Sequence, residues 1–223
     1  MRKSFVVWLG VAAVMFVVAP ILVVRAPYES TMGLVQKIFY YHAPLGMMMF
    51  LSAFVSGIAA GIFIFNRRAA ADRVSLAAAE ITVLFGSLVL ITGPMWARKA
   101  WGVWWQWDAR LTSSLLLWMI FVAYALVRRY GGPGASRLSA GLAVFGMADV
   151  PLVYFAVNFW KTQHPTNNVI PTLGPGMREP FLLGIVCYLL LFIALLAARK
   201  AVRSGERRLH ETHDLAADAG LVE

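Results

Sequence analysis

Cysteine and charged side chains are scarce in this sequence, and each scarcity excludes a class of protein. Cys187 is the only cysteine, so the chain can form neither an internal disulfide nor a CxxC redox pair. Charged residues make up only 14% of the 223 residues, whereas hydrophobic residues make up 60%. The composition therefore excludes thiol–disulfide chemistry by this chain alone. It also excludes an ordinary water-soluble domain and predicts a membrane protein.

Six apolar runs have the length and composition of membrane-spanning helices, which need about 20 residues each. They cover residues 5–24, 43–65, 76–97, 111–127, 138–160 and 181–198. The first run follows two cations, as the apolar segment of a signal peptide does. It is longer than the apolar segment of a typical signal peptide, so it is predicted to be a retained span. The sequence therefore predicts an all-α, polytopic membrane domain over residues 1–200. A polar cytoplasmic tail is expected over residues 201–223.

Lysine and arginine are unevenly divided between the two sides of the membrane that alternate loops would occupy. One side has thirteen: Arg2, Lys3, Arg67, Arg68, Arg73, Arg128, Arg129, Arg137, Arg199, Lys200, Arg203, Arg207 and Arg208. The other has seven: Arg25, Lys37, Arg98, Lys99, Arg110, Lys161 and Arg178. The positive-inside rule places the first set, and both termini, in the cytoplasm. Because the net charge of +9 lies in short loops, it indicates contact with the lipid bilayer rather than with nucleic acid.

The connection between the first two spans contains a short helical pattern. Ser30 or Thr31 could cap a helix whose apolar face extends as far as His42. We expect this helix to lie in the membrane interface, ahead of the second span.

Half of the eight tryptophans lie in the connection that follows the third span. They are Trp101, Trp104, Trp105 and Trp107. An interfacial tryptophan belt would account for one or two of them. This segment also contains Gly102, with Arg98 and Lys99 before it and Arg110 after it. These cations could bind carboxylates or lipid headgroups. A surface that is aromatic in the middle and cationic at its margins is complementary to haem, a planar apolar macrocycle with two carboxylates.

Two histidines are predicted at the same outer boundary as the tryptophans. His42 comes just before the second span and His164 just after the fifth. Either one alone would be interpreted as a polar surface residue. As a pair beside an aromatic surface, they are candidates for the two axial ligands of haem iron, for which neutral imidazole is well suited. His210 and His213 lie in the charged tail on the other side and are interpreted as solvated.

Two aspartates need separate explanations. Asp108 could cap the fourth span near Leu111, orient an indole or Arg110, or contact a ligand directly. Asp149 falls near the middle of the fifth span, where a carboxylate is costly unless it is paired or protonated, and the sequence names no partner for it.

Residues 101–113, WGVWWQWDARLTS, closely resemble the tryptophan-rich WWD signature of membrane haem-handling proteins. The chain length, the six spans and the flanking histidines are similar to those of the CcmC family, the haem exporter protein C of the cytochrome c maturation system. Residues 39–44 resemble the first histidine segment of that family and residues 157–164 the second. The family tends to have two tryptophans where Phe159-Trp160 stands here.

The resemblance implies a non-enzymatic haem-binding subunit of the bacterial inner membrane. Such a protein holds haem b, iron protoporphyrin IX, at the periplasmic face and delivers it to the haem chaperone CcmE, in association with CcmA, CcmB and CcmD. The implied axial ligands are His42 and His164. The implied haem-contacting residues are Trp101, Gly102, Trp104, Trp105, Trp107, Asp108, Arg110, Arg98 and Lys99.

Two alternatives remain open at the level of sequence. One is a transporter that carries haem or another anionic aromatic solute through its own helix bundle, with Asp149 and Pro151 at a midplane site. The other is a structural membrane subunit whose tryptophans only anchor it at the interface.

Overall fold

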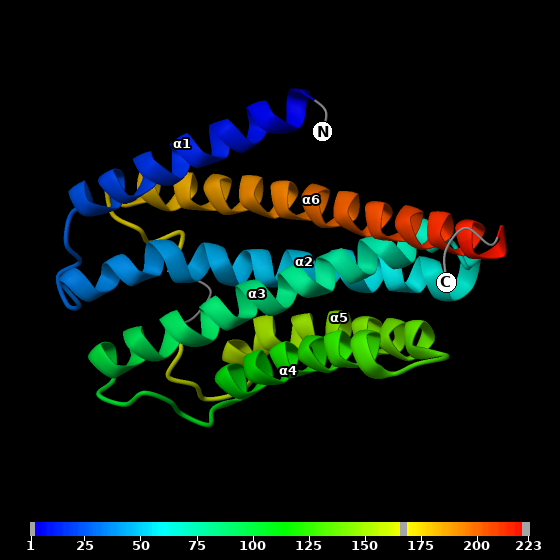
Figure 1. The fold of residues 1–223 in the computed structure, drawn as a ribbon. Helices are drawn as coiled ribbons and strands as arrows, with labels where there is room; N and C mark the ends of the chain where they lie inside the picture. Colours follow the sequence, from blue (N-terminus) through cyan, green and yellow to red (C-terminus); the bar gives the residue numbers. More distant parts are fainter. Residues whose placement is uncertain (1–2, 166–168, 220–223) are drawn as a thin grey trace.

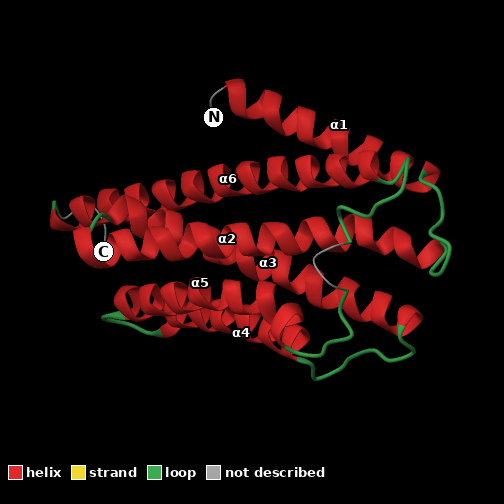
Figure 2. Cartoon of the chain, turned by 180° about the vertical axis from the view of Figure 1, so that it is seen from behind, coloured by secondary structure: helices red, strands yellow, loops and turns green. Residues whose placement is uncertain are grey.

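Six long helices make up most of the computed structural model, which describes residues 3–165 and 169–219. They are α1 (Lys3–Arg25), α2 (Phe39–Asn66), α3 (Ala69–Ala100), α4 (Ala109–Tyr130), α5 (Ala135–Phe159) and α6 (Arg178–Asp218), with a 3₁₀ turn η1 (Leu34–Ile38) before α2. Each of the six is long and apolar enough to cross a membrane. The described chain is helix and loop, without a strand (Figure 2). The prediction of an all-α, six-span membrane protein is confirmed.

The helices run up and down, so their connections alternate between two ends of the bundle (Figure 1). The connections α1–α2, α3–α4 and α5–α6 lie at one end, here called the three-loop end. The turns at residues 67–68 and 131–134 lie at the opposite end. The candidate functional residues in or next to these three connections are therefore brought to a common end by chain direction alone.

Helix α2 occupies the middle of the bundle and packs against α3, α5 and α6, whereas α1 packs mainly against α6 at the edge. Small residues permit this close approach, as is usual between membrane helices. At Gly57 of α2, an added Cβ would lie 2.4 Å from the Cβ of Met147 on α5. At Gly146 of α5, it would lie 2.7 Å from the ring of Phe121 on α4. Glycine at these two positions sets the spacing of α5 against its neighbours.

Hydroxyl groups link three helices inside the bundle. Ser56 of α2 donates a hydrogen bond to the carbonyl of Ser75 on α3 at 2.9 Å. The Ser75 hydroxyl lies 3.2 Å from the hydroxyl of Tyr124 on α4. Interhelical hydrogen bonds of this kind contribute roughly 0.6 kcal/mol each in membranes, so packing of the apolar side chains dominates the stability of the bundle.

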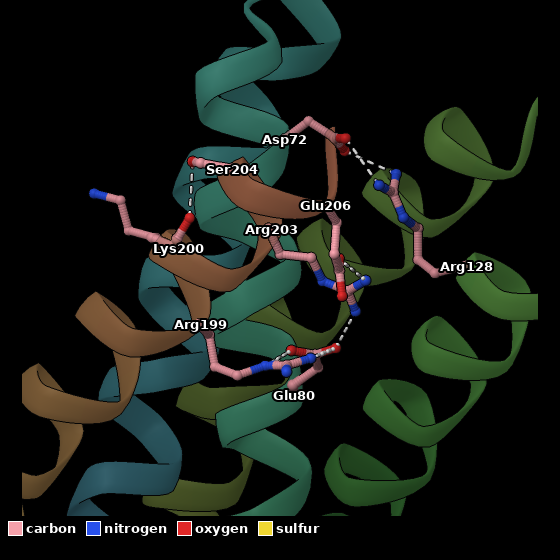
Figure 3. A network of polar contacts seen from close by, with 8 residues as sticks. All are labelled: Asp72, Glu80, Arg128, Arg199, Lys200, Arg203, Ser204 and Glu206. Atoms are coloured by element: carbon pink, nitrogen blue, oxygen red, sulfur yellow. Dashed lines mark hydrogen bonds and ion pairs between the residues drawn. The ribbon is translucent and has the colours of Figure 1, made fainter. Parts of the chain in front are cut away.

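Ion pairs fasten the opposite end of the bundle (Figure 3). Arg128 of α4 binds Asp72 of α3 through two hydrogen bonds of 2.9 Å. Glu80 of α3 accepts two hydrogen bonds of 2.6 Å from Arg199 and one of 2.5 Å from Arg203, both on α6. These contacts hold α6 against α3 where its apolar part ends. The stretch beyond residue 200, expected only as a polar tail, continues α6 as helix to Asp218.

The expectation of a separate interfacial helix capped by Ser30 or Thr31 is wrong. Residue 33, a glycine with φ of 56°, precedes η1, and η1 runs directly into α2. The carboxylate of Glu29 accepts the backbone N–H groups of Thr31 and Met32 at 2.9 and 2.6 Å, and this bonding lowers its pKa. His42 consequently lies in the first turns of α2, not in a loop ahead of it.

Candidate functional site

His42 and His164 converge at the three-loop end from points 122 positions apart in the sequence. His42 lies on α2, and His164 lies in the loop that follows α5. The charges that His164 and Arg110 can carry act on His42, and the charge of Arg110 also acts on His164. The two predicted iron ligands, His42 and His164, and the predicted carboxylate-binding cation Arg110 therefore lie close enough for their charges to interact.

The ring of His42 is held by α3. Its Nδ1 lies 2.9 Å from Oγ1 of Thr92, and the hydroxyl proton of Thr92 is directed at the carbonyl of Leu88, 2.8 Å away. We assign the hydroxyl proton of Thr92 to the Leu88 carbonyl, which can only accept, and therefore assign the proton of the neutral ring to Nδ1. The ring lies against Gly93, where an added Cβ would be 3.2 Å from Cε1 of His42. The lone pair is then on Nε2.

The ring of His164 has the same tautomer for a different reason. Its Nδ1 lies 2.9 Å from the carbonyl oxygen of Pro165. A carbonyl can only accept, so Nδ1 carries the proton and Nε2 carries the lone pair. Metal-binding histidines commonly donate their second ring N–H to such an oxygen, which fixes the ring and raises the basicity of the ligand nitrogen. In both imidazoles the assigned proton is on Nδ1 and the lone pair is on Nε2.

Asp108 joins the tryptophan segment to the loop of His164. Its Oδ1 accepts the N–H of Leu111 at 2.8 Å and caps α4. Its Oδ2 accepts the hydroxyl of Thr162 at 2.7 Å and the N–H of Gln163 at 3.2 Å. Both oxygens therefore have partners within the protein. Of the roles open at the level of sequence, the structure shows the cap, and it adds a link to the second histidine loop.

The four tryptophans of the 101–107 segment do not form one flat surface. Trp101 packs edge-on against Trp96 of α3, with ring centroids 5.1 Å apart. Trp105 packs edge-on against Trp107 at 5.7 Å, and its buried Nε1 has no hydrogen-bond partner among the described residues. The side chains of Trp104 and Trp107 are 60% and 76% exposed. Trp104 and Trp107 are therefore the two indoles of the segment that remain open to contact, and Trp107 also contacts Trp105.

The predicted cations have different surroundings. Arg98 donates to the carbonyl of Gly102, the residue whose φ of 79° turns the chain after α3. Lys99 is exposed. Arg110 is partly buried and donates from Nη1 to the carbonyl of Tyr154 on α5 at 3.1 Å. Arg110 is thus beside the imidazoles rather than at an outer margin, whereas Lys99 remains at the surface.

Thr92 and Thr162 were not predicted from the sequence. Thr162 is two residues before His164, a spacing at which a threonine hydroxyl often accepts a backbone N–H, and it does so here at 2.9 Å. That spacing was the available signal for Thr162. Thr92 gives no such signal, because its contact with His42 joins residues 50 positions apart.

Burial keeps His164 neutral. It lowers the pKa of the imidazole from 6.5 to about 4, and the positive charge of Arg110 acts in the same direction. A neutral ring at physiological pH is the form that binds a metal ion.

We expect His164 in the haem-free protein to titrate near pH 4, and Arg110→Gln to raise its pKa because a repelling charge is removed. The unfolded chain takes up this proton near pH 6.5. The folded state should therefore lose stability as the pH falls from about 6.5 to about 4. The measurement is an NMR titration of the Cε1 proton of His164. Titration near pH 6.5 in the unsubstituted protein would contradict this result.

A polytopic, six-helix membrane protein with a tryptophan-rich segment and two neutral histidines at one end has the features of a haem-handling protein. The family model described as Heme exporter protein C (CcmC) matches residues 1–214. The chain belongs to this family.

Three relatives support this assignment. The chain is 35% identical over 193 residues to Heme exporter protein C of Bradyrhizobium diazoefficiens, covering 80% of this chain and 73% of that protein. It is 30% identical over 205 residues to Heme exporter protein C of Escherichia coli K12, covering 87% and 82%. A mitochondrial protein of Marchantia polymorpha, named as ccmC-like and for cytochrome c biosynthesis, is 31% identical over 144 residues, covering 65% and 61%. The protein is a multi-pass membrane component of haem handling in cytochrome c biogenesis.

Proposed function

We propose that this chain holds haem b at the periplasmic face of the bacterial inner membrane and presents it to the haem chaperone CcmE. His42 and His164 would be the axial iron ligands, and the tryptophan segment would contact the porphyrin. The observation that carries the proposal is that His42 and His164, each with Nδ1 held by a hydrogen bond, lie at the three-loop end, where the charge of Arg110 acts on both.

The donor set fits haem iron in its chemistry. Two neutral imidazoles with free Nε2 lone pairs suit a low-spin iron with one ligand on each face. The two histidines come from separate elements, a helix and a loop, so they need not lie on the same face of the haem. Bound haem would supply a reactive vinyl edge, which this chain presents by positioning rather than by catalysis.

Aromatic and cationic groups support contact with the rest of the macrocycle. Trp104 and Trp107 offer exposed rings, and the buried Nε1 of Trp105, which has no hydrogen-bond partner among the described residues, offers a donor. Arg98, Lys99 and Arg110 are the cations available to face propionates, because a guanidinium that donates once to a backbone carbonyl, as those of Arg98 and Arg110 do, keeps further N–H donors. Gly102 and Trp101 shape the segment, and Asp108 holds it against the loop of His164.

Partners would supply what this sequence lacks. It has no phosphate-binding glycine motif for ATP and no thiol pair for an apocytochrome, so we assign energy coupling and thiol chemistry to other components, with CcmA, CcmB and CcmD as the associated subunits. The excess of lysine and arginine at the opposite end of the bundle supports a cytoplasmic location for that end and for both termini.

The test uses vesicles that contain the full chain together with CcmA, CcmB, CcmD and CcmE. Haem should be found on CcmE only when this chain is present, because it is the component that holds the haem. Equal haem on CcmE without the chain would contradict the proposal.

The same vesicles separate the transporter alternative. Its support is Asp149, whose Oδ2 is buried without a hydrogen-bond partner in the described chain. If haem crosses the bundle by way of this carboxylate, Asp149→Asn should abolish flux and leave haem binding at the surface intact. If the chain presents haem from its outer face, Asp149→Asn should leave transfer to CcmE unchanged.

A further inference from the structure

A chain of hydrogen bonds connects the N-terminus of α4 to the backbone of His164. The carboxylate of Asp108 accepts the hydroxyl of Thr162 at 2.7 Å, and the Thr162 oxygen accepts the backbone N–H of His164 at 2.9 Å. The residues come from two loops that are 54 positions apart. Nothing in either local sequence pattern requires the loops to meet.

Chemistry fixes the direction of each bond in this chain. An ionised carboxylate only accepts and a backbone N–H only donates, so the single hydroxyl of Thr162 must donate to Asp108 and accept from His164. A serine at position 162 could make both bonds, whereas a valine of nearly the same shape could make neither. A hydrogen bond to a carboxylate is also stronger than one between neutral groups.

The hydrogen bonds from Asp108 through Thr162 fix the backbone of His164, as the helix α2 fixes the backbone of His42. His42 is fixed by the backbone of α2 and by Thr92 on α3. His164 lies beyond the end of α5, where no helical backbone holds it. Its backbone N–H is fixed by Thr162 and its Nδ1 by the carbonyl of Pro165, so the backbone and the ring are both oriented, while Nε2 has no hydrogen-bond partner among the described residues.

We propose that Asp108 and Thr162 are positioning residues that orient His164 as an iron ligand, and that Asp108 acts through Thr162 rather than by touching haem. The inference rests on the proposed function, in which His164 binds the iron. It assigns to the aspartate of the tryptophan segment a role in the second histidine loop. Groups that orient a metal ligand typically account for 10–100-fold in metal affinity.

The test compares Thr162→Val with Thr162→Ser in the purified full chain loaded with haem. Thr162→Val should weaken haem binding by about 10-fold or more and convert low-spin haem to high-spin haem, and added imidazole should restore the low-spin spectrum by replacing the displaced ligand. Thr162→Ser should behave as the unsubstituted protein. Thr212→Val is the matched control, because the Thr212 hydroxyl donates to the Arg208 carbonyl within α6 at the opposite end, so its loss should change nothing at the haem.

A second variant addresses the aspartate. Asp108→Asn keeps an oxygen that can cap Leu111, but the amide nitrogen that replaces the second oxygen only donates, so it can accept neither the Thr162 hydroxyl nor the Gln163 N–H. It should reproduce the effect of Thr162→Val. Unaltered binding and spectra in both Thr162→Val and Asp108→Asn would overturn the positioning role, and so would a change in Asp108→Asn alone, since that would point to direct contact with haem.

Hydrogen exchange in the haem-free protein supplies a readout that does not depend on iron. The amide of His164 should exchange faster in Thr162→Val than in Thr162→Ser, and equal protection would overturn the inference. A parallel His164→Ala sample tests the positioning role of Thr162 separately from the assignment of His164 as an axial ligand. Loss of low-spin haem in His164→Ala with none in Thr162→Val defeats only the positioning role, whereas retention of low-spin haem in His164→Ala defeats the axial assignment itself.

Discussion

Replacement of either His42 or His164 by alanine should abolish the low-spin, bis-imidazole spectrum of the haem-loaded protein. Each ring is neutral by assignment and presents Nε2, so each variant removes one of two axial ligands. Because loss of a group that merely orients a ligand costs about 10–100-fold in metal affinity, loss of the ligand should cost at least about 100-fold. The measurement is an absorption titration of the purified chain with haem, in the oxidised and reduced forms.

The matched control is His213→Ala. His213 is exposed on the part of α6 that extends past the opposite end of the bundle, so its removal should leave the spectrum and the affinity unchanged. Exogenous imidazole should restore six-coordinate haem in the two site variants, because free imidazole can occupy the space that the removed histidine ring leaves. Full retention of the low-spin spectrum by both His42→Ala and His164→Ala would exclude the axial assignment.

The double variant Trp104→Ala, Trp107→Ala should lose most of its capacity to capture haem while keeping its fold. Burial of a large apolar side chain contributes about 1.5–3 kcal/mol. Because a planar guest would cover only part of each ring, we expect about 1.5 kcal/mol for each indole. The total of about 3 kcal/mol corresponds to roughly 100-fold weaker binding. The folded state should be little affected, since the two side chains are 60% and 76% exposed.

Trp8→Ala is the control for this double variant. Trp8 is 59% exposed on α1, a helix at the edge of the bundle, so its loss removes a similar indole without touching the three-loop end. Haem binding that survives the double variant at full strength would favour the alternative in which the tryptophans only anchor the protein in the membrane interface.

The positions of the helices followed from the sequence because membrane spans are a local property. A run of about 20 apolar residues has to become a helix in lipid, where no other backbone partner is available. Counting six such runs also predicts that residues 42, 101–110 and 164 share one end. The structure agrees on that shared end. The length of α6 was missed, because its continuation to Asp218 is polar and is fastened by Arg199 and Arg203 to Glu80 on another helix.

Only the tertiary structure decided how the candidate site residues are arranged. The sequence predicted one aromatic surface that includes four indoles, but Trp101 packs edge-on against Trp96, while Trp104 and Trp107 remain exposed. Arg110 was expected at a cationic margin, and it lies beside the imidazoles.

The sequence by itself determined the membrane class, the number of helices and the end of the bundle at which the histidines and tryptophans meet. The structure provided the hydrogen-bond partners from which the ring protons of His42 and His164 are assigned. It also determined which carboxylate oxygen of Asp108 accepts from Thr162 and which accepts from Leu111. The reason is that span length and chain direction depend on consecutive residues. A hydrogen bond requires the donor–acceptor distance to be correct within a few tenths of an ångström. In these bonds the two groups are 50 or more positions apart in the sequence, so only the packed bundle sets that distance.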